Sequence, residues 1–198
     1  MHVMHDEALA HLRTDPVLSA VIDRVGELAP LFPAVSPFAS LARSVVGQLI
    51  STRAAAAVEG RLRDLAPNLA PAELAEISHE QLRGAGLSNA KAATVHDLAR
   101  RTLVGALDFE ALARADDEEV TAALVSIKGI GRWTAEMFLL FALGRPDVFS
   151  WGDGALRRAV KNLYGDEAGP EVAEAWRPYR SLASRYLWRS LSVSTSGV

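Results

Sequence analysis

The sequence predicts an all-α fold of many short helices, and three observations support that prediction. Alanine and leucine dominate the chain, whereas alternating β-branched residues are scarce. Apolar residues recur at the spacing of amphipathic helices almost everywhere. Proline and glycine break these segments at Pro30, Pro33 and Pro37, at Pro67 and Pro71, and at Gly144 with Pro146. The expected helices cover residues 16–29, 37–50, 52–65, 71–76, 79–84, 89–104, 108–113, 116–125, 131–143, 155–163, 170–177 and 179–192.

Composition narrows the class of protein. The 198 residues are enough for one domain or two small fused subdomains. Hydrophobic residues make up 49% and charged residues 23%, which is typical of a globular protein with a buried core. No stretch approaches the ~20 apolar residues of a membrane span, and the N-terminus does not resemble a signal peptide. The absence of cysteine excludes disulfides, Cys-ligated zinc and Cys-ligated iron–sulfur clusters. We expect a cytoplasmic protein.

The distribution of charge leaves nucleic-acid binding open. A net charge of −3 argues mildly against such a partner. However, residues 1–127 carry 11 Lys and Arg against 17 Asp and Glu, whereas residues 128–198 carry 10 against 7. The more basic part of the chain therefore begins at a glycine motif, which permits DNA binding without proving it.

That motif is "KGIGRWTAEMF", residues 128–138. Two glycines this close disfavour a helix, but they let the backbone turn tightly. The helix that follows has unpaired N–H groups and a positive dipole end at its start, where a phosphate could approach the amides of Gly131 through Thr134. The pattern predicts a helix–hairpin–helix that grips a DNA backbone. A plain glycine turn between two helices is the alternative, and the two glycines alone favour it.

Asp153 follows in the otherwise apolar "VFSWGD". Its simplest role is the N-cap of the helix that begins "GALRRAV". A cap position also fixes a carboxylate in place, so this role is compatible with a catalytic one. Trp133 would usually be a core residue.

Together these residues resemble a known family. "SIKGIGRWTAEMFLLFALGRPDVFSWGD" is similar to the signature of the helix–hairpin–helix DNA glycosylases, in particular the 3-methyladenine DNA glycosylase II branch. The segments "SVVGQLISTRAAAAV", "LRGAGLSNAKAATV" and "AWRPYRSLASRYLWR" resemble further blocks of that family in the right order. The similarity covers most of residues 37–190.

The resemblance implies a fold and an activity. The fold would be that of the helix–hairpin–helix DNA glycosylases, with two helical subdomains flanking an active-site cleft. Residues 37–145 would form the subdomain with the hairpin, and residues 1–36 and 146–198 would form the other. The activity would be that of a monofunctional glycosylase, a monomer that flips alkylated bases out of duplex DNA and excises them by hydrolysis.

The resemblance also implies site residues. Asp153 matches the catalytic carboxylate, and Trp133 and Trp188 match positions that line the base pocket. Bifunctional relatives carry a Schiff-base lysine at the position of Trp133, so strand cleavage is not expected. Gln48 and Leu49 match the wedge that enters the base stack, although an ordinary core role for Leu49 is equally compatible with the sequence.

The hairpin would supply two further sets of contacts. The predicted contacts to the DNA backbone are Gly129, Gly131, Arg132 and Thr134. No cofactor is required, but a monovalent cation (Na or K) would bind the backbone carbonyls of Val125, Ile127 and Ile130. The five histidines show no metal-ligand spacing.

Departures from the family pattern concern the pocket. Ser150 and Trp151 stand where the family has Pro and a small residue, and Met137 stands where some relatives have an aromatic ring. Lys128 replaces a common Pro. We therefore include Trp151 and Met137 among the predicted pocket residues and expect the departures to affect substrate range more than reaction type.

Two functions from other classes compete with this reading. One is a non-catalytic DNA-binding protein that kept the hairpin and lost the chemistry, and Asp153 argues against it. The other is a helical protein–protein interaction module, which only the acidic total charge favours.

Overall fold

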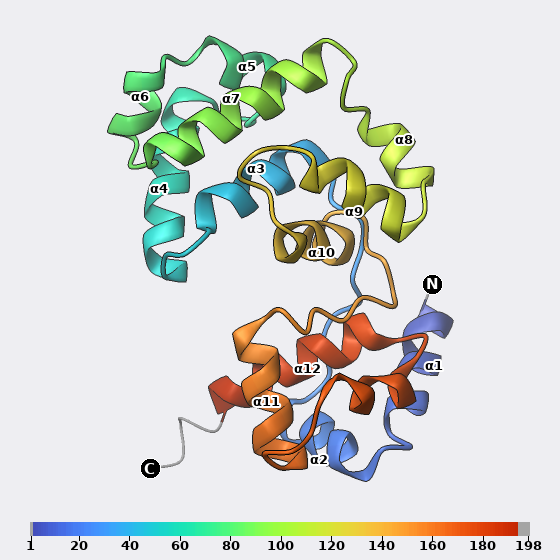
Figure 1. The fold of residues 1–198 in the computed structure, drawn as a ribbon. Helices are drawn as coiled ribbons and strands as arrows, with labels where there is room; N and C mark the ends of the chain where they lie inside the picture. The colour runs from blue at the N-terminus through green and yellow to red at the C-terminus, as the bar shows by residue number, and fades with distance from the viewer. Residues whose placement is uncertain (1, 194–198) are drawn as a thin grey trace. The chain divides into compact units, whose positions relative to one another are not determined.

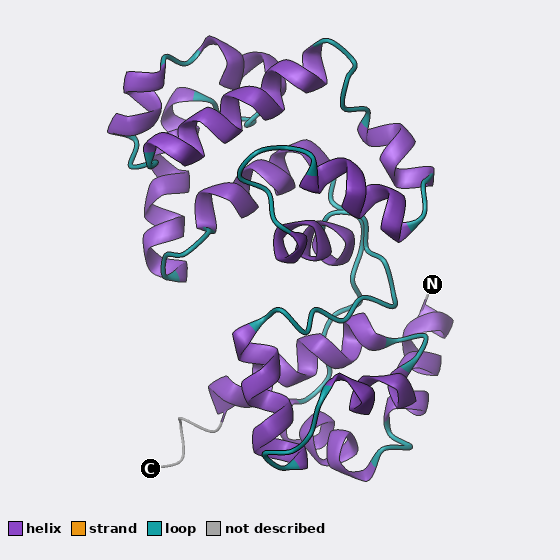
Figure 2. Cartoon of the chain, in the orientation of Figure 1, coloured by secondary structure: helices purple, strands orange, loops and turns teal. Residues whose placement is uncertain are grey.

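The structure is a computed structural model that describes the backbone of residues 2–193 and the side chains of residues 5–192. Within this range the chain forms helices and loops and no strand, so the all-α prediction is confirmed (Figures 1 and 2). No helix among the described residues is long and apolar enough to cross a membrane. The helices are α1 (His2–Leu12), α2 (Pro16–Val25), α3 (Pro37–Gly47), α4 (Thr52–Leu65), α5 (Pro71–Glu76), α6 (His79–Gly84), α7 (Asn89–Leu103), α8 (Phe109–Arg114), α9 (Asp117–Val125), α10 (Arg132–Phe141), α11 (Gly154–Tyr164), the 3₁₀ helix η1 (Pro170–Trp176) and α12 (Arg180–Val193).

Some helix boundaries differ from the expected ones for local reasons. Helix α1 was not predicted, because its sequence shows only a faint helical periodicity of apolar residues. The second helix ends at Val25 because Gly26 has a φ of +78°, a left-handed conformation that closes the helix. The next ends at Gly47 rather than residue 50, since the chain turns sharply at Leu49. Residues 170–176 form a 3₁₀ helix instead of an α-helix.

The chain divides into two compact units, which are described separately. The first combines residues 1–32 with residues 144–198 and is called the terminal unit below; the second, residues 33–143, is called the hairpin unit. The expected boundaries, after residues 36 and 145, lie a few residues away from the observed ones.

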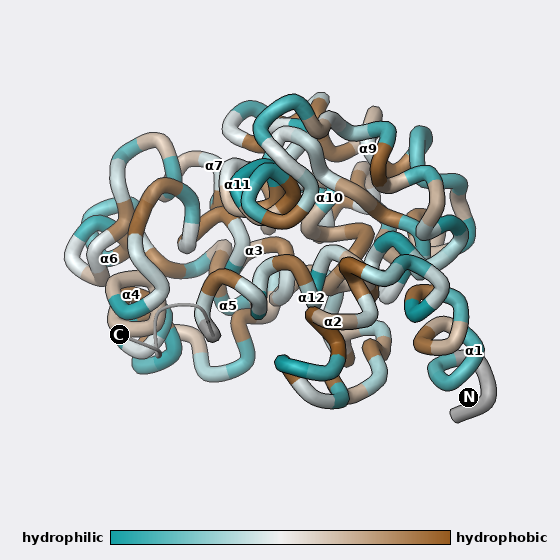
Figure 3. Tube along the Cα trace, turned by 90° about the horizontal axis from the view of Figure 1, so that it is seen from below, coloured by the Kyte–Doolittle hydropathy of each residue, from teal (hydrophilic) through white to brown (hydrophobic). Residues whose placement is uncertain are grey.

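In the hairpin unit, apolar helix faces pack around α3, α7 and α10. Figure 3 shows hydrophobic and hydrophilic residues alternating along the helices, as amphipathic packing requires. Helix α10 contacts α3 and α9, and α7 contacts α3, α5 and α6. Phe38, Phe109 and Phe138 form a chain of ring contacts, with centroids 5.9 and 5.8 Å apart. This core holds the segment between α9 and α10 in place.

That segment turns at Gly129, against helix α7. Gly129 has a φ of +95°, and a Cβ added there would overlap the hydroxyl of Thr94. The Thr94 hydroxyl lies 3.0 Å from the carbonyl oxygens of Ala90 and Lys128, to which it can donate. Gly131, in contrast, has extended backbone (φ −96°), and a Cβ there would meet open space. The two glycines of the motif therefore have different roles: Gly129 permits the close approach of the turn to α7, and Gly131 leaves the start of α10 uncovered.

In the terminal unit, Asp15 joins segments from both ends of the chain. Its Oδ1 caps α2 by accepting from the amides of Val17 and Leu18, at 2.9 and 3.1 Å. Its Oδ2 accepts from the Tyr164 hydroxyl at 2.6 Å and from the indole N–H of the fully buried Trp176 at 2.9 Å. Burial alone would raise the pKa of Asp15, but the four hydrogen bonds together hold it below its ordinary value.

Replacing Asp15 should destabilise the terminal unit. Asp15→Ala removes the helix cap, worth about 1 kcal/mol, and leaves two donors unsatisfied at about 1 kcal/mol each. We expect a loss of about 3 kcal/mol in the free energy of unfolding, measured by urea titration. Asp166→Ala, at an exposed position of the same unit, is the control and should cost less than about 0.5 kcal/mol.

The contribution of Asp15 should also depend on pH. Because its folded pKa lies below the unfolded value, the stability it confers is present above the unfolded pKa and is lost as pH falls through the folded pKa. The difference between the wild type and Asp15→Ala should therefore be constant at neutral pH and shrink below about pH 4. A difference that grows on acidification would contradict the assignment.

The hairpin glycines should respond unequally to substitution. Gly129→Ala places a side chain in a left-handed conformation, which costs about 1–2 kcal/mol, and adds the overlap with Thr94. Gly131→Ala should cost about 1 kcal/mol or less, since the backbone is extended and the space is open. Urea titration of both variants measures the difference, and equal losses would show that the turn does not depend on Gly129.

Candidate functional site

Asp153 is the N-cap of α11, as its simplest reading predicted. Its Oδ1 accepts from the amide of Leu156 at 2.7 Å and from the indole N–H of Trp188 at 3.1 Å. The backbone amide of Asp153 donates to the carbonyl of Ser150 at 3.0 Å, which closes a tight turn. Three elements thus hold the carboxylate in one orientation: the start of α11, the turn at residues 150–153, and α12.

The turn before Asp153 is braced by its neighbours. One Arg157 guanidinium nitrogen donates to the carbonyls of Trp151 and Gly152, at 2.8 and 2.9 Å. The ring of Trp151 stacks on Phe149, with centroids 6.2 Å apart and planes 27° from parallel. Sequence reasoning missed Arg157, and its position one turn into the helix that Asp153 caps is the signal that could have found it.

A carboxylate fixed in this way can stabilise a positive charge that develops beside it. A group already oriented by hydrogen bonds needs no rearrangement when the charge appears, which makes the electrostatic interaction more effective. The partial positive charge at the helix start and the indole N–H of Trp188 both interact favourably with a carboxylate at this position. The turn therefore holds the Asp153 carboxylate in a fixed orientation.

The start of α10 presents backbone amides. Gly131 is the N-cap of α10 and, having no side chain, provides no cap hydrogen bond. Arg132 forms ion pairs with Glu118 and Glu136, each at 3.1 Å, and these two carboxylates raise its pKa. The predicted backbone-binding residues would thus offer a DNA phosphate mainly the N–H groups at the helix start, because the Arg132 guanidinium is paired with two carboxylates.

The segment after α3 carries the two predicted wedge residues, which face different ways. Leu49 has a φ of +58° and is 104% exposed, so it is not a core residue. A left-handed conformation costs a residue of this kind about 1–2 kcal/mol. The side-chain amide of Gln48 instead donates to the carbonyl of Gly129 at 3.1 Å and to Oγ1 of the buried Thr134 at 3.0 Å. Gln48 therefore ties the segment to the hairpin, while Leu49 projects from it.

The four predicted pocket residues fall into two groups. Trp133 and Met137 lie one turn apart on α10 of the hairpin unit; Trp133 is 39% exposed and Met137 only 6%. Trp151 and Trp188 belong to the terminal unit, where both pack partly against its core. A base pocket that combines the two groups stays a prediction.

The described residues offer little for a metal other than backbone oxygen. They contain no cluster of three or more His, Asp or Glu side chains that could hold an ion. Val125 ends α9, and the carbonyl of Ile127 accepts from the amide of Ile130 at 3.0 Å within the turn. A carbonyl oxygen has two lone pairs, so this bond is compatible with the predicted cation.

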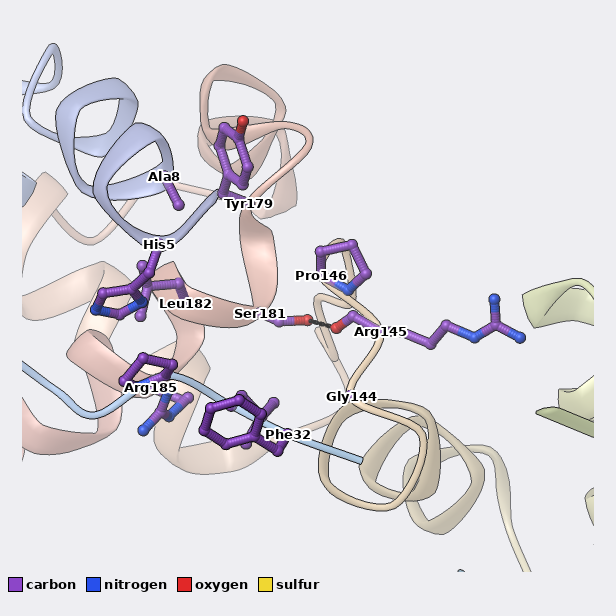
Figure 4. A pocket seen from close by; sticks show the side chains of 12 residues that line it. His5, Ala8, Phe32, Gly144, Arg145, Pro146, Tyr179, Ser181, Leu182 and Arg185 are labelled. Carbon is purple, nitrogen blue, oxygen red and sulfur yellow. Dashed lines mark hydrogen bonds between the residues drawn. The ribbon is translucent and has the colours of Figure 1, made fainter. Parts of the chain in front are cut away.

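A cavity in the terminal unit involves none of the predicted residues. It lies between α1, the segments around Phe32 and Pro146, and the start of α12 (Figure 4). The Ser181 hydroxyl donates to the carbonyl of Arg145 at its wall, at 2.6 Å.

Comparisons with known proteins identify the family of the chain. A family model described as the HhH-GPD superfamily base excision DNA repair protein matches residues 42–179. DNA-3-methyladenine glycosylase 1 of Schizosaccharomyces pombe is 32% identical over 168 residues, covering 80% of this chain and 74% of that protein. The Bacillus subtilis protein YfjP is 36% identical over 127 residues, which are 61% of this chain and 44% of YfjP, so the match spans less than half of that relative.

Solved structures extend the similarity to the fold. The DNA-3-methyladenine glycosidase of Bacillus halodurans superimposes with a TM-score of 0.80 at 37% identity, covering 94% of this chain and 89% of that one. The 3-methyladenine DNA glycosylase Mag1 of S. pombe, solved in complex with abasic DNA, superimposes with a TM-score of 0.84 at 30% identity, covering 92% and 95%. The predicted helix–hairpin–helix glycosylase fold is confirmed, and the chain belongs to the HhH-GPD superfamily of base excision DNA repair proteins.

Proposed function

We propose that this protein is a monofunctional DNA glycosylase that flips alkylated bases, such as 3-methyladenine and 7-methylguanine, out of duplex DNA and excises them by hydrolysis in base excision repair. The observation that carries the proposal is the Asp153 carboxylate, held by Leu156 and Trp188. Relatives named as DNA-3-methyladenine glycosylases support the substrate class.

The chemistry follows from the charge that the reaction creates. When the bond between the sugar C1′ and the base nitrogen breaks, the base leaves with the electron pair and the sugar becomes cationic. Asp153 would stabilise that cation and orient a water, whose oxygen bonds to C1′ while its proton passes to solvent. A cationic methylated purine leaves as a neutral base, so it needs no proton from an acid.

The aromatic residues favour electron-poor bases. Trp133, Trp151 and Trp188 would offer ring faces that attract a cationic purine by stacking and cation–π interaction. Ring faces provide little means of reading base edges, so discrimination would depend on the charge and lability of the damaged base. Trp133 also leaves no amine for a Schiff base at that position, which makes water the nucleophile.

The hairpin unit would bind the DNA backbone. The N–H groups at the start of α10 are suited to a phosphate, and the projecting Leu49 is suited to fill the gap that a flipped base leaves. A monovalent cation on the carbonyls of Val125, Ile127 and Ile130 would add positive charge beside the phosphate. We expect the protein to act as a monomer on damaged duplexes.

A panel of duplexes with single lesions tests the function. We expect 3-methyladenine and 7-methylguanine to be released faster than hypoxanthine or uracil in single-turnover reactions, because a cationic base weakens its own glycosidic bond. The product should be an intact abasic strand that breaks only on alkali treatment. Faster release of uracil than of 3-methyladenine would refute the alkylation assignment, and a borohydride-trapped covalent adduct would refute the monofunctional one.

Asp153→Asn tests the catalytic assignment. The amide keeps an oxygen that can accept from Leu156 and Trp188 but loses the charge, so DNA affinity should persist while base release falls about 100–1000-fold. Asp166→Asn, at an exposed position of the same unit, is the matched control and should keep the wild-type rate. An Asp153→Asn enzyme that excises at the wild-type rate would remove Asp153 from the mechanism. A wild-type protein that binds damaged DNA without releasing bases would instead support the non-catalytic alternative.

A further inference from the structure

Lys91 has an unusual environment in the hairpin unit. It lies in the first turn of α7, and its Nζ donates to the backbone carbonyls of Val46 at 2.7 Å and Gln48 at 2.6 Å. No ion pair of Lys91 with a carboxylate occurs among the described residues. Burial lowers the pKa of its ammonium group. The partly buried ammonium group of Lys91 therefore binds one short segment of main chain, residues 46–48.

That segment is the end of α3 and the turn that follows it. The last carbonyls of a helix have no partner within the helix, and a cation is favourable at that end. By binding the carbonyls of residues 46 and 48, Lys91 holds the main chain on both sides of Gly47, where α3 ends. Leu49 is the next residue, with its left-handed backbone and fully exposed side chain.

A left-handed leucine persists only where its surroundings hold it. On one side, Lys91 holds the main chain of Gln48, and the Gln48 side chain binds the hairpin at Gly129. On the other side, Ser51 caps α4 by accepting from the amide of Ala54 at 3.2 Å. The strained residue is therefore anchored at both ends.

We propose that Lys91 is a positioning residue for base flipping. It holds the turn of residues 48–50 in the conformation that projects Leu49, so that the wedge is already formed when DNA arrives. Thr94, one turn further along α7, binds the hairpin at Lys128. One helix thus supports both segments that face DNA. The inference rests on the proposed function, because it requires a reaction in which a base is flipped.

The test is a double-mutant cycle between Lys91→Met and Leu49→Ala. Flipping is followed by the fluorescence of 2-aminopurine beside a 3-methyladenine lesion, and excision by single-turnover rates. Lys91→Met alone should reduce flipping and excision about tenfold. This is the order of magnitude expected when Leu49 relaxes out of its strained left-handed conformation and the wedge must be re-formed on DNA. In the Leu49→Ala background the same change should alter both by less than about twofold, since Lys91 acts through Leu49.

Controls separate positioning from a general loss of structure. Lys161→Met makes the same chemical change at an exposed lysine and should leave flipping unaffected. Affinity for undamaged duplex and the native helix content of Lys91→Met should stay close to those of the wild type. If Lys91→Met lacks native helix content, Lys91→Gln, which keeps a neutral N–H₂ donor group, replaces it in the cycle under the same criterion.

The outcomes distinguish this inference from the function on which it rests. An equal loss in both backgrounds would show that Lys91 does not act through Leu49, and would overturn the inference. A Leu49→Ala variant with normal flipping would overturn it too, while excision by the wild type would leave the proposed function standing. A wild-type protein that flips and excises nothing would overturn both.

Discussion

No side chain fits at position 129, and the hairpin unit depends on this constraint. With hydrogen in place of a Cβ, the turn between α9 and α10 comes close enough to α7 for the Thr94 hydroxyl to reach the carbonyl of Lys128. The same approach puts the carbonyl of Gly129 within reach of the Gln48 side chain, at 3.1 Å. Removing one methyl group thus lets three segments distant in sequence share hydrogen bonds. The position of the amides at the start of α10 therefore depends on the contacts of the preceding turn with Thr94 and Gln48.

In the terminal unit, too, neighbouring residues position a small functional group, here the Asp153 carboxylate. Asp153 carries the proposed chemistry, but Trp188 and Arg157 decide where it points, one by bonding the carboxylate and the other by bracing the turn before it. Apart from the tryptophan rings proposed to stack on the base, the groups that would meet DNA are few and small: a carboxylate, some amides and one leucine. Larger side chains are used to hold them. We expect a site of this kind to tolerate substitutions in the pocket wall, because residues outside the pocket wall, such as Arg157, help to set the orientation of the carboxylate.

The sequence predicted the elements that have strong local signals. Helix existence, the glycine turn and the cap at Asp153 were all recognisable, because proline, glycine and a capping carboxylate act on the backbone nearby. The tertiary roles were not recognisable. Nothing local distinguishes an exposed Leu49 from a buried one, and the bonds from Lys91 and Gln48 join segments more than forty residues apart. The weakly amphipathic α1 was missed because its periodic signal is faint.

The hydrogen bonds of Asp15 have a consequence for how the chain is made. The indole of Trp176 and the phenol of Tyr164, which donate to Asp15, lie 161 and 149 residues further along the sequence. The whole hairpin unit separates Asp15 from these two donors in the sequence. During synthesis the hairpin unit can therefore close around its own core while α1 and α2 still lack their partners. Their apolar residues stay open to chaperones or to wrong contacts until α11 and α12 leave the ribosome. The carboxylate of the proposed chemistry is then set in place last, so an unfinished chain can hold the amides proposed to bind DNA without yet holding Asp153.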